Sequence, residues 1–316
     1  MGISPSDKIY IAGHRGLMGS AFVRMFESSG YRNLLLRSRE ELDLRDREPV
    51  RDLFSKNRPD IVVIGAGCVG GIQENLDHGF ELLRDNLLVQ TNIILSAQEF
   101  GARKVVYLGS SCMYPRVASQ PMAEETLLSG KPEESSLPYA MAKLAGLHLC
   151  LAYNRQNPGK VFLPVIPNST YGPNDDFSPG KGHVLSALIT RFHEAKSTGV
   201  EKVVLWGTGS PRREFIYSDD VASAVLHLLE KNPDLEFPAN IGVGEDVSIR
   251  ELAEMVRSAI GYEGAIQWDT SKPDGAPRKL LDSSRFLKTG WNPTVSLREG
   301  IEKTYRWFLE DKEARS

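Results

Sequence analysis

Cysteine is scarce in this sequence, with only Cys68, Cys112 and Cys150 among 316 residues. Their wide spacing argues against both a disulfide framework and a cysteine-ligated metal site. The six histidines are not spaced as metal ligands either, so we expect no metal. So few thiols are typical of a chain in a reducing compartment, and we expect this protein to be cytoplasmic.

Long apolar runs and an excess of charge of one sign are also missing. No stretch approaches the roughly 20 apolar residues that span a bilayer, and residues 1–8 contain no apolar signal-peptide core. We therefore expect no membrane association. The net charge is −3 and there is no basic cluster, so a nucleic-acid polymer is not an expected partner.

The first half of the chain instead alternates short apolar runs with amphipathic helical patterns. This alternation indicates an α/β fold with a doubly wound parallel sheet of the Rossmann type, in which ligands bind beyond the carboxyl ends of the strands. The predicted strands are residues 8–13, 33–38, 60–67, 104–111 and 160–167. The predicted helices are residues 16–30, about 49–56, about 80–100 and 139–156.

The alternation of strands and helices is interrupted after residue 168. A loop rich in Gly, Pro and Asp is expected at residues 169–182, and Ser248 with Glu251 forms a capping box that predicts a helix over 247–261. We expect a smaller, mixed α/β C-terminal domain that binds the substrate. The predicted division assigns residues 1–168 and about 211–245 to the nucleotide-binding domain, and about 169–210 and 246–316 to the substrate domain.

A glycine-rich turn joins the first predicted strand to the first helix. Gly13, Gly16 and Gly19 allow a tight turn, close approach of a pyrophosphate, and close packing of the helix on the strand. The helix begins near Leu17 and Met18, whose backbone amides can donate to phosphate oxygens. This arrangement predicts a dinucleotide site.

The residues after the second strand distinguish between the two nicotinamide dinucleotides. An NAD site favours a carboxylate here, which binds the ribose hydroxyls. This sequence has Arg37, Ser38 and Arg39 before any acidic residue. Arg39, together with Arg15 of the glycine turn, can hold a 2′-phosphate by charge-assisted hydrogen bonds. We infer that the cofactor is NADP(H).

A Tyr-x-x-x-Lys pair, Tyr139 and Lys143, begins the helix after the fourth strand. Their i,i+4 spacing places both side chains on one face of that helix. A phenol titrates near ~10, so Tyr139 needs a nearby cation to work at neutral pH, and Lys143 supplies one while also reaching the nicotinamide ribose. Ser110, at the end of the fourth strand, can hydrogen-bond the reacting carbonyl oxygen. These three residues predict reduction of a carbonyl.

Several longer stretches carry a family resemblance. "AGHRGLMGSA", "LGSSCMYP", "PYAMAKLAG", "WGTGSPRREF" and "SKPDGAPRKLLD" resemble the extended short-chain dehydrogenases/reductases and, among them, the GDP-L-fucose synthase family. The matching stretches run from residue 11 to the C-terminus. The resemblance implies an enzyme that uses NADPH to epimerise C3 and C5 of GDP-4-keto-6-deoxy-D-mannose and to reduce C4, giving GDP-L-fucose.

This reaction requires an acid–base pair beside Ser110, Tyr139 and Lys143. The C4 carbonyl acidifies the protons on C3 and C5, so a base can remove each proton and an acid can return it from the other face. The resemblance maps Cys112 and His183 onto the catalytic cysteine and histidine. It also implies that Leu108, Lys143 and His183 contact the cofactor.

The predicted substrate residues lie in the later segments. Arg191 and Arg213 are suitable forks for a diphosphate, and Trp206 can line the pocket of the base or ribose. Asp274 and Lys279 match family positions that contact the nucleotide sugar. These residues predict a GDP-linked 4-keto-6-deoxy sugar as the substrate.

Three positions depart from the family pattern. Cys68 stands where the family usually has a lysine, Asn168 lies three residues before Tyr171 instead of two, and Tyr217 replaces a usual histidine. The first two flank the expected nicotinamide and sugar sites, so they bear on which sugar is used more than on the reaction type.

Four functions therefore remain open. Besides GDP-L-fucose formation, the chain is compatible with epimerisation or reduction of another GDP-4-keto-6-deoxy sugar, such as a heptose. The weaker alternatives are a non-catalytic NADP(H)-binding protein and a 4-epimerase with bound NAD. The resemblance also implies a homodimer formed through the helices at about 80–100 and 139–156.

Overall fold

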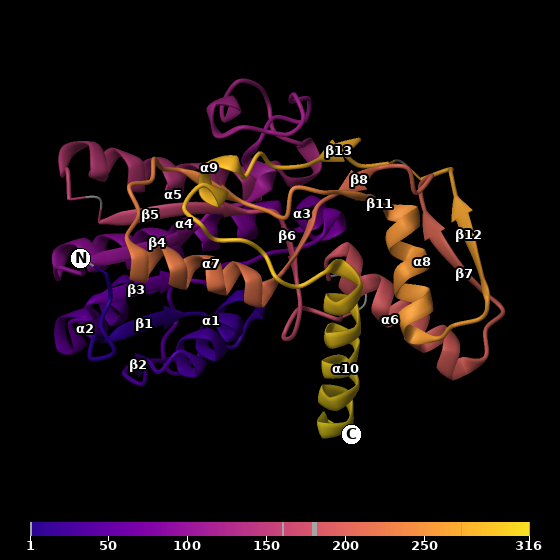
Figure 1. The fold of residues 1–316 in the computed structure, drawn as a ribbon, viewed down its shortest axis with the longest axis horizontal. Helices are drawn as coiled ribbons and strands as arrows, with labels where there is room; N and C mark the ends of the chain where they lie inside the picture. Colours follow the sequence, from indigo (N-terminus) through magenta and orange to yellow (C-terminus); the bar gives the residue numbers. More distant parts are fainter. Residues whose placement is uncertain (1, 160, 179–181, 273, 316) are drawn as a thin grey trace.

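The structure is a computed structural model that describes residues 2–159, 161–178, 182–272 and 274–315 (Figure 1). A parallel sheet forms its centre, with six strands in these residues and the order β10-β5-β4-β3-β1-β2. This confirms the predicted fold class. The strands are β1 (Ile9–Ala12), β2 (Leu34–Leu35), β3 (Ile61–Ile64), β4 (Lys104–Leu108), β5 (Phe162–Pro167) and β10 (Ala239–Ile241).

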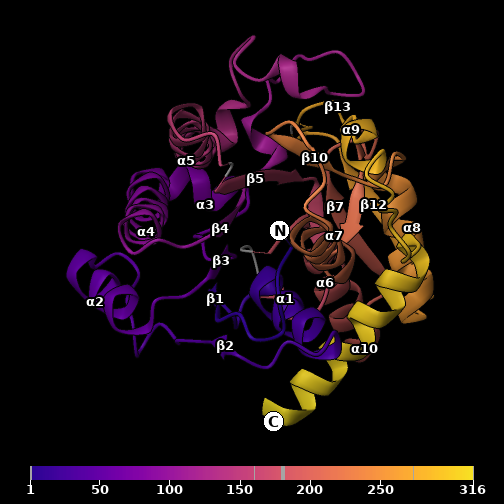
Figure 2. The same cartoon turned by 60° about the vertical axis from the view of Figure 1, so that its left-hand side comes forward.

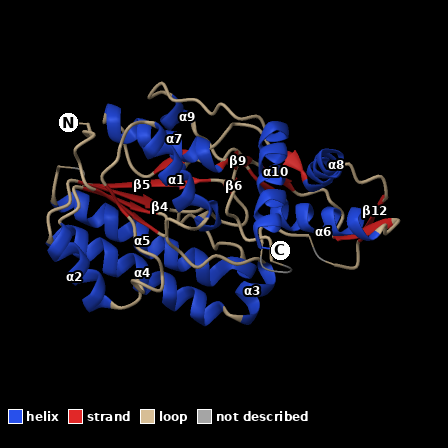
Figure 3. Cartoon of the chain, turned by 90° about the horizontal axis from the view of Figure 1, so that it is seen from below, coloured by secondary structure: helices blue, strands red, loops and turns tan. Residues whose placement is uncertain are grey.

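Helices cover both faces of this sheet (Figures 2 and 3). One face carries α1 (Leu17–Ser28) and α7 (Ser218–Lys231), and the other carries α2 (Arg47–Asn57), α4 (Gly79–Glu99) and α5 (Leu137–Gln156). Successive strand residues point to opposite faces. The side chains of β1 consequently alternate between two hydrophobic cores, which explains why its apolar run is continuous.

The predicted elements differ from the structure at several places, and the predicted strands 60–67 and 104–111 end earlier, at Ile64 and Leu108. Residues 33–38 form only the two-residue edge strand β2. The predicted loop at 169–182 begins with β6 (Ser169–Tyr171), which pairs with β9 (Phe215–Tyr217), and residues 179–181 lie outside the described part. A short helix, α3 (Ile72–Asp77), precedes α4. Pairing with residues far along the chain leaves no local sequence signal.

The C-terminal part packs a two-stranded sheet against three helices. β7 (Lys202–Trp206) pairs in parallel with β12 (Ala265–Asp269). The predicted capping box is present, because the Ser248 side chain accepts from the Glu251 amide and the Glu251 side chain bonds back to Ser248. The helices are α6 (Val184–Thr198), α8 (Ile249–Ile260) and α10 (Leu297–Arg315).

A small three-stranded sheet lies between the large sheet and the C-terminal part (Figure 1). β8 (Arg212–Arg213) is its middle strand, with β11 (Val247–Ser248) antiparallel on one side and β13 (Arg278–Lys279) parallel on the other. The division of the chain into two domains stays a prediction. The pairings place Arg212 and Arg213 with segments of the later part. Among the described residues, no helix combines the length and apolarity needed to cross a membrane.

Candidate active site

The glycine turn after β1 packs tightly against the loop that follows β3. Gly13 has φ of +76°, and a Cβ there would lie 2.7 Å from the Cα of Ala66. A Cβ on Gly19 would lie 2.0 Å from the carbonyl oxygen of Gly13. Gly16 precedes α1 and makes no side-chain cap, so the first amides of the helix, at Leu17 and Met18, are available to a phosphate. The turn fits a pyrophosphate.

Two arginines gather beside a carboxylate after β2. The Arg15 Nη1 lies 3.4 Å from an Oε2 of Glu40, and both side chains are exposed. Hydrogen bonds from its own backbone and from Ser38 lower the pKa of Glu40, and the charges of Arg15 and Arg39 lower it further. The charges of both guanidinium groups therefore act on one carboxylate, and the 2′-phosphate clamp stays a prediction.

Tyr139 and Lys143 lie buried on the face of α5 that meets the end of β4. The Lys143 Nζ donates a 2.9 Å hydrogen bond to the Leu108 carbonyl and lies 5.8 Å from the centroid of the Tyr139 ring. Burial lowers the pKa of Lys143 to about 8. Burial, aided by the charge of Cys112, raises the pKa of Tyr139, against a hydrogen bond with Ser110. Tyr139 is thus a proton donor in the free protein.

Cys112 follows β4 in the short 3-10 turn Ser111–Met113. The Cys112 amide donates to the Ser110 Oγ at 3.2 Å, and the Lys279 Nζ lies 3.8 Å from the Cys112 Sγ. Burial alone would raise the pKa of the Cys112 thiol. The charge of Lys279 and the hydrogen bonds of Ser110 and Ser136 outweigh burial, so the thiol pKa lies below its ordinary value. This environment favours the thiolate, the form that acts as a base.

His183 comes immediately before α6 and is paired with a carboxylate. Its Nδ1 lies 3.2 Å from an Oδ1 of Asp175, whose side chain is buried, while the His183 side chain is 45% exposed. Burial lowers the pKa of His183, but the hydrogen bond and charge of Asp175 and the charge of Cys112 outweigh it and raise the pKa. His183 and Cys112 are thus close enough to affect each other's titration.

Sequence reasoning missed Asp175. The carboxylate lies in the run "NDD" of the loop that leads to His183, eight residues earlier. An acidic residue in such a loop is ordinarily solvated, whereas the Asp175 side chain is buried beside the imidazole. Its proximity in the sequence was the available signal.

Arg213 and Lys279 are direct partners in the parallel pair β8 and β13. Burial lowers the pKa of Arg213, while the charges of Cys112 and Glu133 act in the opposite direction. Arg213 also lines a cavity of about 380 Å³ together with Phe215, other apolar residues of the later segments and Glu245. The structure therefore brings two of the predicted substrate residues beside Cys112.

The other three predicted substrate residues gather elsewhere, around the end of β7. Trp206 is exposed on that strand, and an Arg191 Nη1 donates to the Val204 carbonyl at 3.4 Å. Asp274 accepts hydrogen bonds from the Thr208 amide and hydroxyl at 2.9 and 2.7 Å. Asp274 thus holds the turn after β7 in the free protein.

The first departure from the family pattern borders the site. Side-chain atoms of Asn86 bind the Cys68 amide at 3.0 Å and the Cys68 carbonyl at 2.8 Å. Burial raises the pKa of the Cys68 thiol, and this thiol influences the titration of both Tyr139 and Lys143. Cys68 is therefore a neighbour of Tyr139 and Lys143.

The other two departures are structural in the free protein. The Asn168 side-chain NH2 group donates to the Glu214 carboxylate and, at 3.4 Å, to the Lys279 carbonyl. Tyr217 is buried, with its ring centroid 5.7 Å from that of Tyr171.

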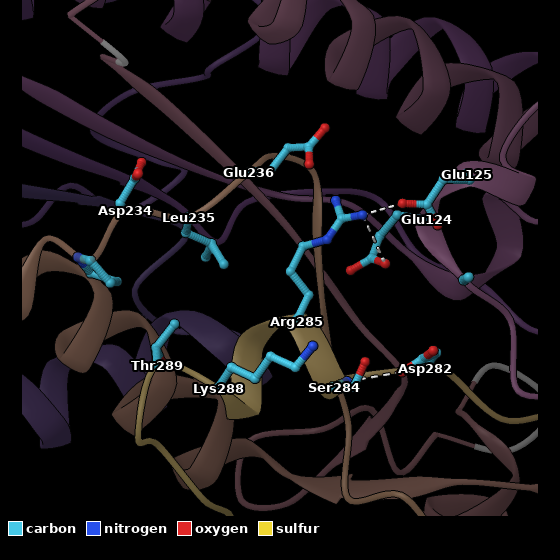
Figure 4. A pocket seen from close by; sticks show the side chains of 12 residues that line it. Glu124, Glu125, Asp234, Leu235, Glu236, Asp282, Ser284, Arg285, Lys288 and Thr289 are labelled. Atoms are coloured by element: carbon cyan, nitrogen blue, oxygen red, sulfur yellow. Dashed lines mark hydrogen bonds and ion pairs between the residues drawn. The ribbon is translucent and has the colours of Figure 1, made fainter.

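A cavity of about 740 Å³ lies apart from these residues (Figure 4). Its lining comes from residues 123–125, from residues 233–236 before β10, and from the helix α9 (Ser284–Leu287) and its neighbours. Arg285 reaches across it toward Glu124 and Glu125, and Lys288 and Asp282 also line it. The described lining includes none of the residues predicted for catalysis or binding.

Comparisons with known proteins show the family of this chain. The profile of the NAD dependent epimerase/dehydratase family matches residues 9–244. GDP-L-fucose synthase 1 of Arabidopsis thaliana is 49% identical over 306 residues, which are 97% of this chain and 94% of that protein.

Solved structures give the same result. A GDP-6-OMe-4-keto-L-xylo-heptose reductase from C. jejuni superimposes with a TM-score of 0.92 at 33% identity, covering 98% of this chain and 100% of that one. A GDP-L-fucose synthetase from Naegleria fowleri bound to NADP has a TM-score of 0.90 at 31% identity, covering 99% and 96%. The chain therefore belongs to the NAD dependent epimerase/dehydratase family and, within it, to the group of the GDP-L-fucose synthases.

Proposed function

We propose that this protein uses NADPH to convert GDP-4-keto-6-deoxy-D-mannose into GDP-L-fucose by epimerisation at C3 and C5 followed by reduction at C4. The observation that carries the proposal is the thiol of Cys112, which lies 3.8 Å from the Lys279 ammonium and shares its surroundings with His183. Reduction of a ketone alone needs no such acid–base pair.

The epimerisation uses Cys112 and His183 in complementary roles. As a thiolate, Cys112 removes a proton from the carbon next to the C4 ketone, and the imidazolium of His183, stabilised by Asp175, returns one from the other face. The enolate oxygen that forms meanwhile accepts hydrogen bonds from Ser110 and Tyr139. Proton exchange with solvent then restores the thiolate and the imidazolium, and repetition at the second carbon completes the double inversion.

The reduction uses the residues at the end of β4 and the start of α5. Bound NADPH supplies the hydride for C4. Tyr139, whose pKa burial keeps high, donates the proton to the C4 oxygen, and Ser110 holds that oxygen in place. Lys143 balances the charge left on the phenol from one helical turn away.

The chain's own residues fit the cofactor. The glycine turn approaches Ala66 so closely that a Cβ on Gly13 would clash, and the first amides of α1 face the turn without a side-chain cap. Arg15 and Arg39 would hold the 2′-phosphate, and Lys143 with Leu108 the nicotinamide ribose. Arg191, Trp206, Arg213, Asp274 and Lys279 would hold the GDP-sugar.

The second candidate is reduction of a GDP-4-keto heptose, favoured by the structural similarity to the C. jejuni heptose reductase. The identity to the A. thaliana synthase is higher, at 49% against 33%, and favours the hexose. We further infer a cytoplasmic homodimer formed through α4 and α5, whose exposed apolar residues include Phe80, Leu88 and Leu95, and a division into the two domains given above.

The deciding experiment incubates the protein with GDP-4-keto-6-deoxy-D-mannose in deuterated water, without NADPH and then with it. We expect deuterium at C3 and C5 in the first case and GDP-L-fucose in the second, both identified by NMR. Cys112→Ser should greatly slow the labelling and still permit reduction of pre-epimerised substrate. If the substrate takes up no deuterium and is reduced at C4 with C3 and C5 unchanged, the proposal is contradicted. The protein would then be a reductase without epimerase activity.

A further inference from the structure

Glu214 is a buried carboxylate to which the proposed mechanism gives no role. Its side chain is 0% exposed, and it lies on the chain between Arg213 of β8 and Phe215 of β9. We propose that Glu214 is a positioning residue that holds the Lys279 ammonium against the Cys112 thiol and thereby sets the reactivity of that thiol. Its importance for turnover rests on the proposed function, whereas the contact itself can be tested without any substrate.

Four N–H groups converge on this carboxylate. One oxygen accepts from the Val243 and Gly244 amides at 2.7 and 2.8 Å. The other accepts from the Leu281 amide at 3.0 Å and from the Asn168 side chain. Burial raises the pKa of Glu214 above its ordinary value, and these hydrogen bonds reduce the rise without cancelling it. Because both oxygens face donors, the ionised form is the one that this site accommodates.

These donors come from three segments that are far apart in the sequence. Asn168 follows β5, Val243 and Gly244 follow β10, and Leu281 follows β13. The first two lie at the carboxyl edge of the large sheet, and the third belongs to the strand pair that carries Arg213 and Lys279. Glu214 therefore ties that strand pair to the edge of the sheet where Cys112 also lies.

The Glu214 backbone amide, together with the Asn168 side chain that also bonds the carboxylate, holds the backbone of Lys279. Its carbonyl accepts from the Glu214 amide at 3.2 Å and from the Asn168 side chain at 3.4 Å, and Leu281 lies two residues further on. From this backbone the Lys279 side chain reaches the Cys112 Sγ at 3.8 Å. An opposite charge at this distance strongly favours the thiolate, and the effect weakens as the distance grows.

The surroundings of Glu214 leave room for the carboxylate and for little else. A Cβ added to Gly242 would lie 2.3 Å from a Glu214 Oε1. A buried carboxylate is unfavourable unless its oxygens are fully bonded. Glutamine would keep the shape, but its NH2 group would face two of the four donors and disrupt the contacts on that side.

The test measures the rate at which iodoacetamide alkylates Cys112 in the full-length protein as a function of pH, quantified by mass spectrometry of the Cys112 peptide. Glu214→Gln should slow alkylation at pH 7 by about fivefold to tenfold and shift the profile to higher pH, since displaced Lys279 no longer stabilises the thiolate. Lys279→Met should cause at least as large a change.

The matched control is Asp220→Asn. Asp220 is also buried and accepts from the Thr294 amide and hydroxyl and from the Val295 amide, at 2.9 to 3.0 Å. The control should lose stability and keep the wild-type alkylation profile. An equal shift in Asp220→Asn would overturn the proposal, because general loosening of the fold would then explain the result.

Two further outcomes decide against the proposal. A wild-type profile in folded Glu214→Gln would show that the carboxylate only stabilises the fold, and a wild-type profile in Lys279→Met would remove the premise. If Glu214→Gln does not fold, Gly242→Ala takes its place, since the added methyl displaces the carboxylate, and it must shift the profile in the same direction. Failure of the proposed function would instead appear as absent sugar turnover with this profile intact.

Discussion

We predict that the selectivity for NADPH over NADH depends on Arg39. Arg39→Ala should weaken NADPH binding about 10- to 100-fold, the loss typical of a hydrogen bond to a charged group. NADH binding should change little, because NADH has no 2′-phosphate. Titration of the bound nicotinamide fluorescence gives both constants.

Arg37→Ala is the control for Arg39→Ala. The Arg37 Nη1 donates to the carbonyl of its neighbour Leu36 at 2.7 Å, so its loss should leave both affinities near wild type. Equal weakening of NADPH and NADH in Arg39→Ala would refute the phosphate contact.

The buried ammonium of Lys143 makes the reduction sensitive to alkaline pH. Its pKa is about 8, so Lys143 is charged below that pH and neutral above it. We expect kcat/KM with NADPH to fall as the pH rises through about 8, because the charge that supports the phenol is lost. The raised pKa of Tyr139 means that loss of the phenol proton does not cause this fall.

Initial rates measured with a pre-epimerised substrate isolate the reduction from the thiol chemistry. A rate that stays constant to about pH 9.5 would contradict the role of Lys143.

Single residues differ in how far the sequence reveals them. Ser110, Tyr139 and Lys143 lie on adjacent predicted elements, so their meeting follows from the alternation of strands and helices. The contact between Lys279 and Cys112 joins residues 167 positions apart, and no periodicity predicts it. The family resemblance placed Lys279 at the substrate, but its approach to the thiol required the structure.

Among the secondary-structure elements, α4 carries several buried polar side chains that bind other segments. Asn86 binds the loop after β3, Gln90 binds the Ala142 carbonyl of α5 at 2.7 Å, and Asn92 binds the Leu44 and Arg45 carbonyls at 3.0 and 2.9 Å. One helix thus positions loops around the predicted nucleotide site.

Asn86→Ala should loosen the loop that carries Cys68. The change removes hydrogen bonds to the Cys68 amide and carbonyl and to the Leu82 carbonyl, so the free energy of unfolding should fall by about 1–3 kcal/mol. NADPH should bind several-fold more weakly, since this loop packs against Gly13 and Lys143. Urea denaturation and cofactor titration measure the two effects.

Asn157→Ala serves as the comparison, because the exposed Asn157 side chain donates a local hydrogen bond to the Tyr153 carbonyl. It should stay within about 0.5 kcal/mol of wild type. A loss of stability in Asn86→Ala with unchanged NADPH affinity would show that the loop does not depend on α4 for its position.

Elements with local signals were predictable and those with distant partners were not. The helix predicted at 139–156 and the capping box at Ser248 matched α5 and the start of α8 closely. The strands β6, β8, β9 and β13 have two or three residues each and pair only across long separations. Such short segments have no period to detect.

For the whole molecule, the open question is assembly. Leu88 and Leu95 of α4 are 40% and 43% exposed, and Met141 of α5 is also exposed. We predict that this surface joins two copies, because exposed apolar residues on adjacent helices are typical of an interface. Leu88→Glu combined with Leu95→Glu should give a monomer of 35.1 kDa by light scattering, against twice that mass for the wild type.

Val204→Glu is the control for the double variant. Val204 is 44% exposed on β7 of the later part, and its replacement should leave the dimer intact. A wild-type protein that is already monomeric, or a double variant that keeps the wild-type mass, would contradict this interface.

For the whole molecule, the fold class could be predicted from the sequence, whereas the connection between its parts could not. Strand–helix alternation is enough to predict a doubly wound sheet. The connection at Glu214 depends on one carboxylate that accepts hydrogen bonds from three separate segments. Each of these segments looks like an ordinary loop in the sequence.

The last strand of the large sheet, β10, enters only after the chain has left the sheet and returned. A fragment that ends at Pro167 would expose β5, a strand of six consecutive buried residues, at one edge of the sheet. The unpaired backbone of β5 would then pair with other chains, so this fragment should precipitate when it is expressed alone. Supplied with residues 168–316 as a separate polypeptide, it should instead be recovered in soluble form as a complemented pair.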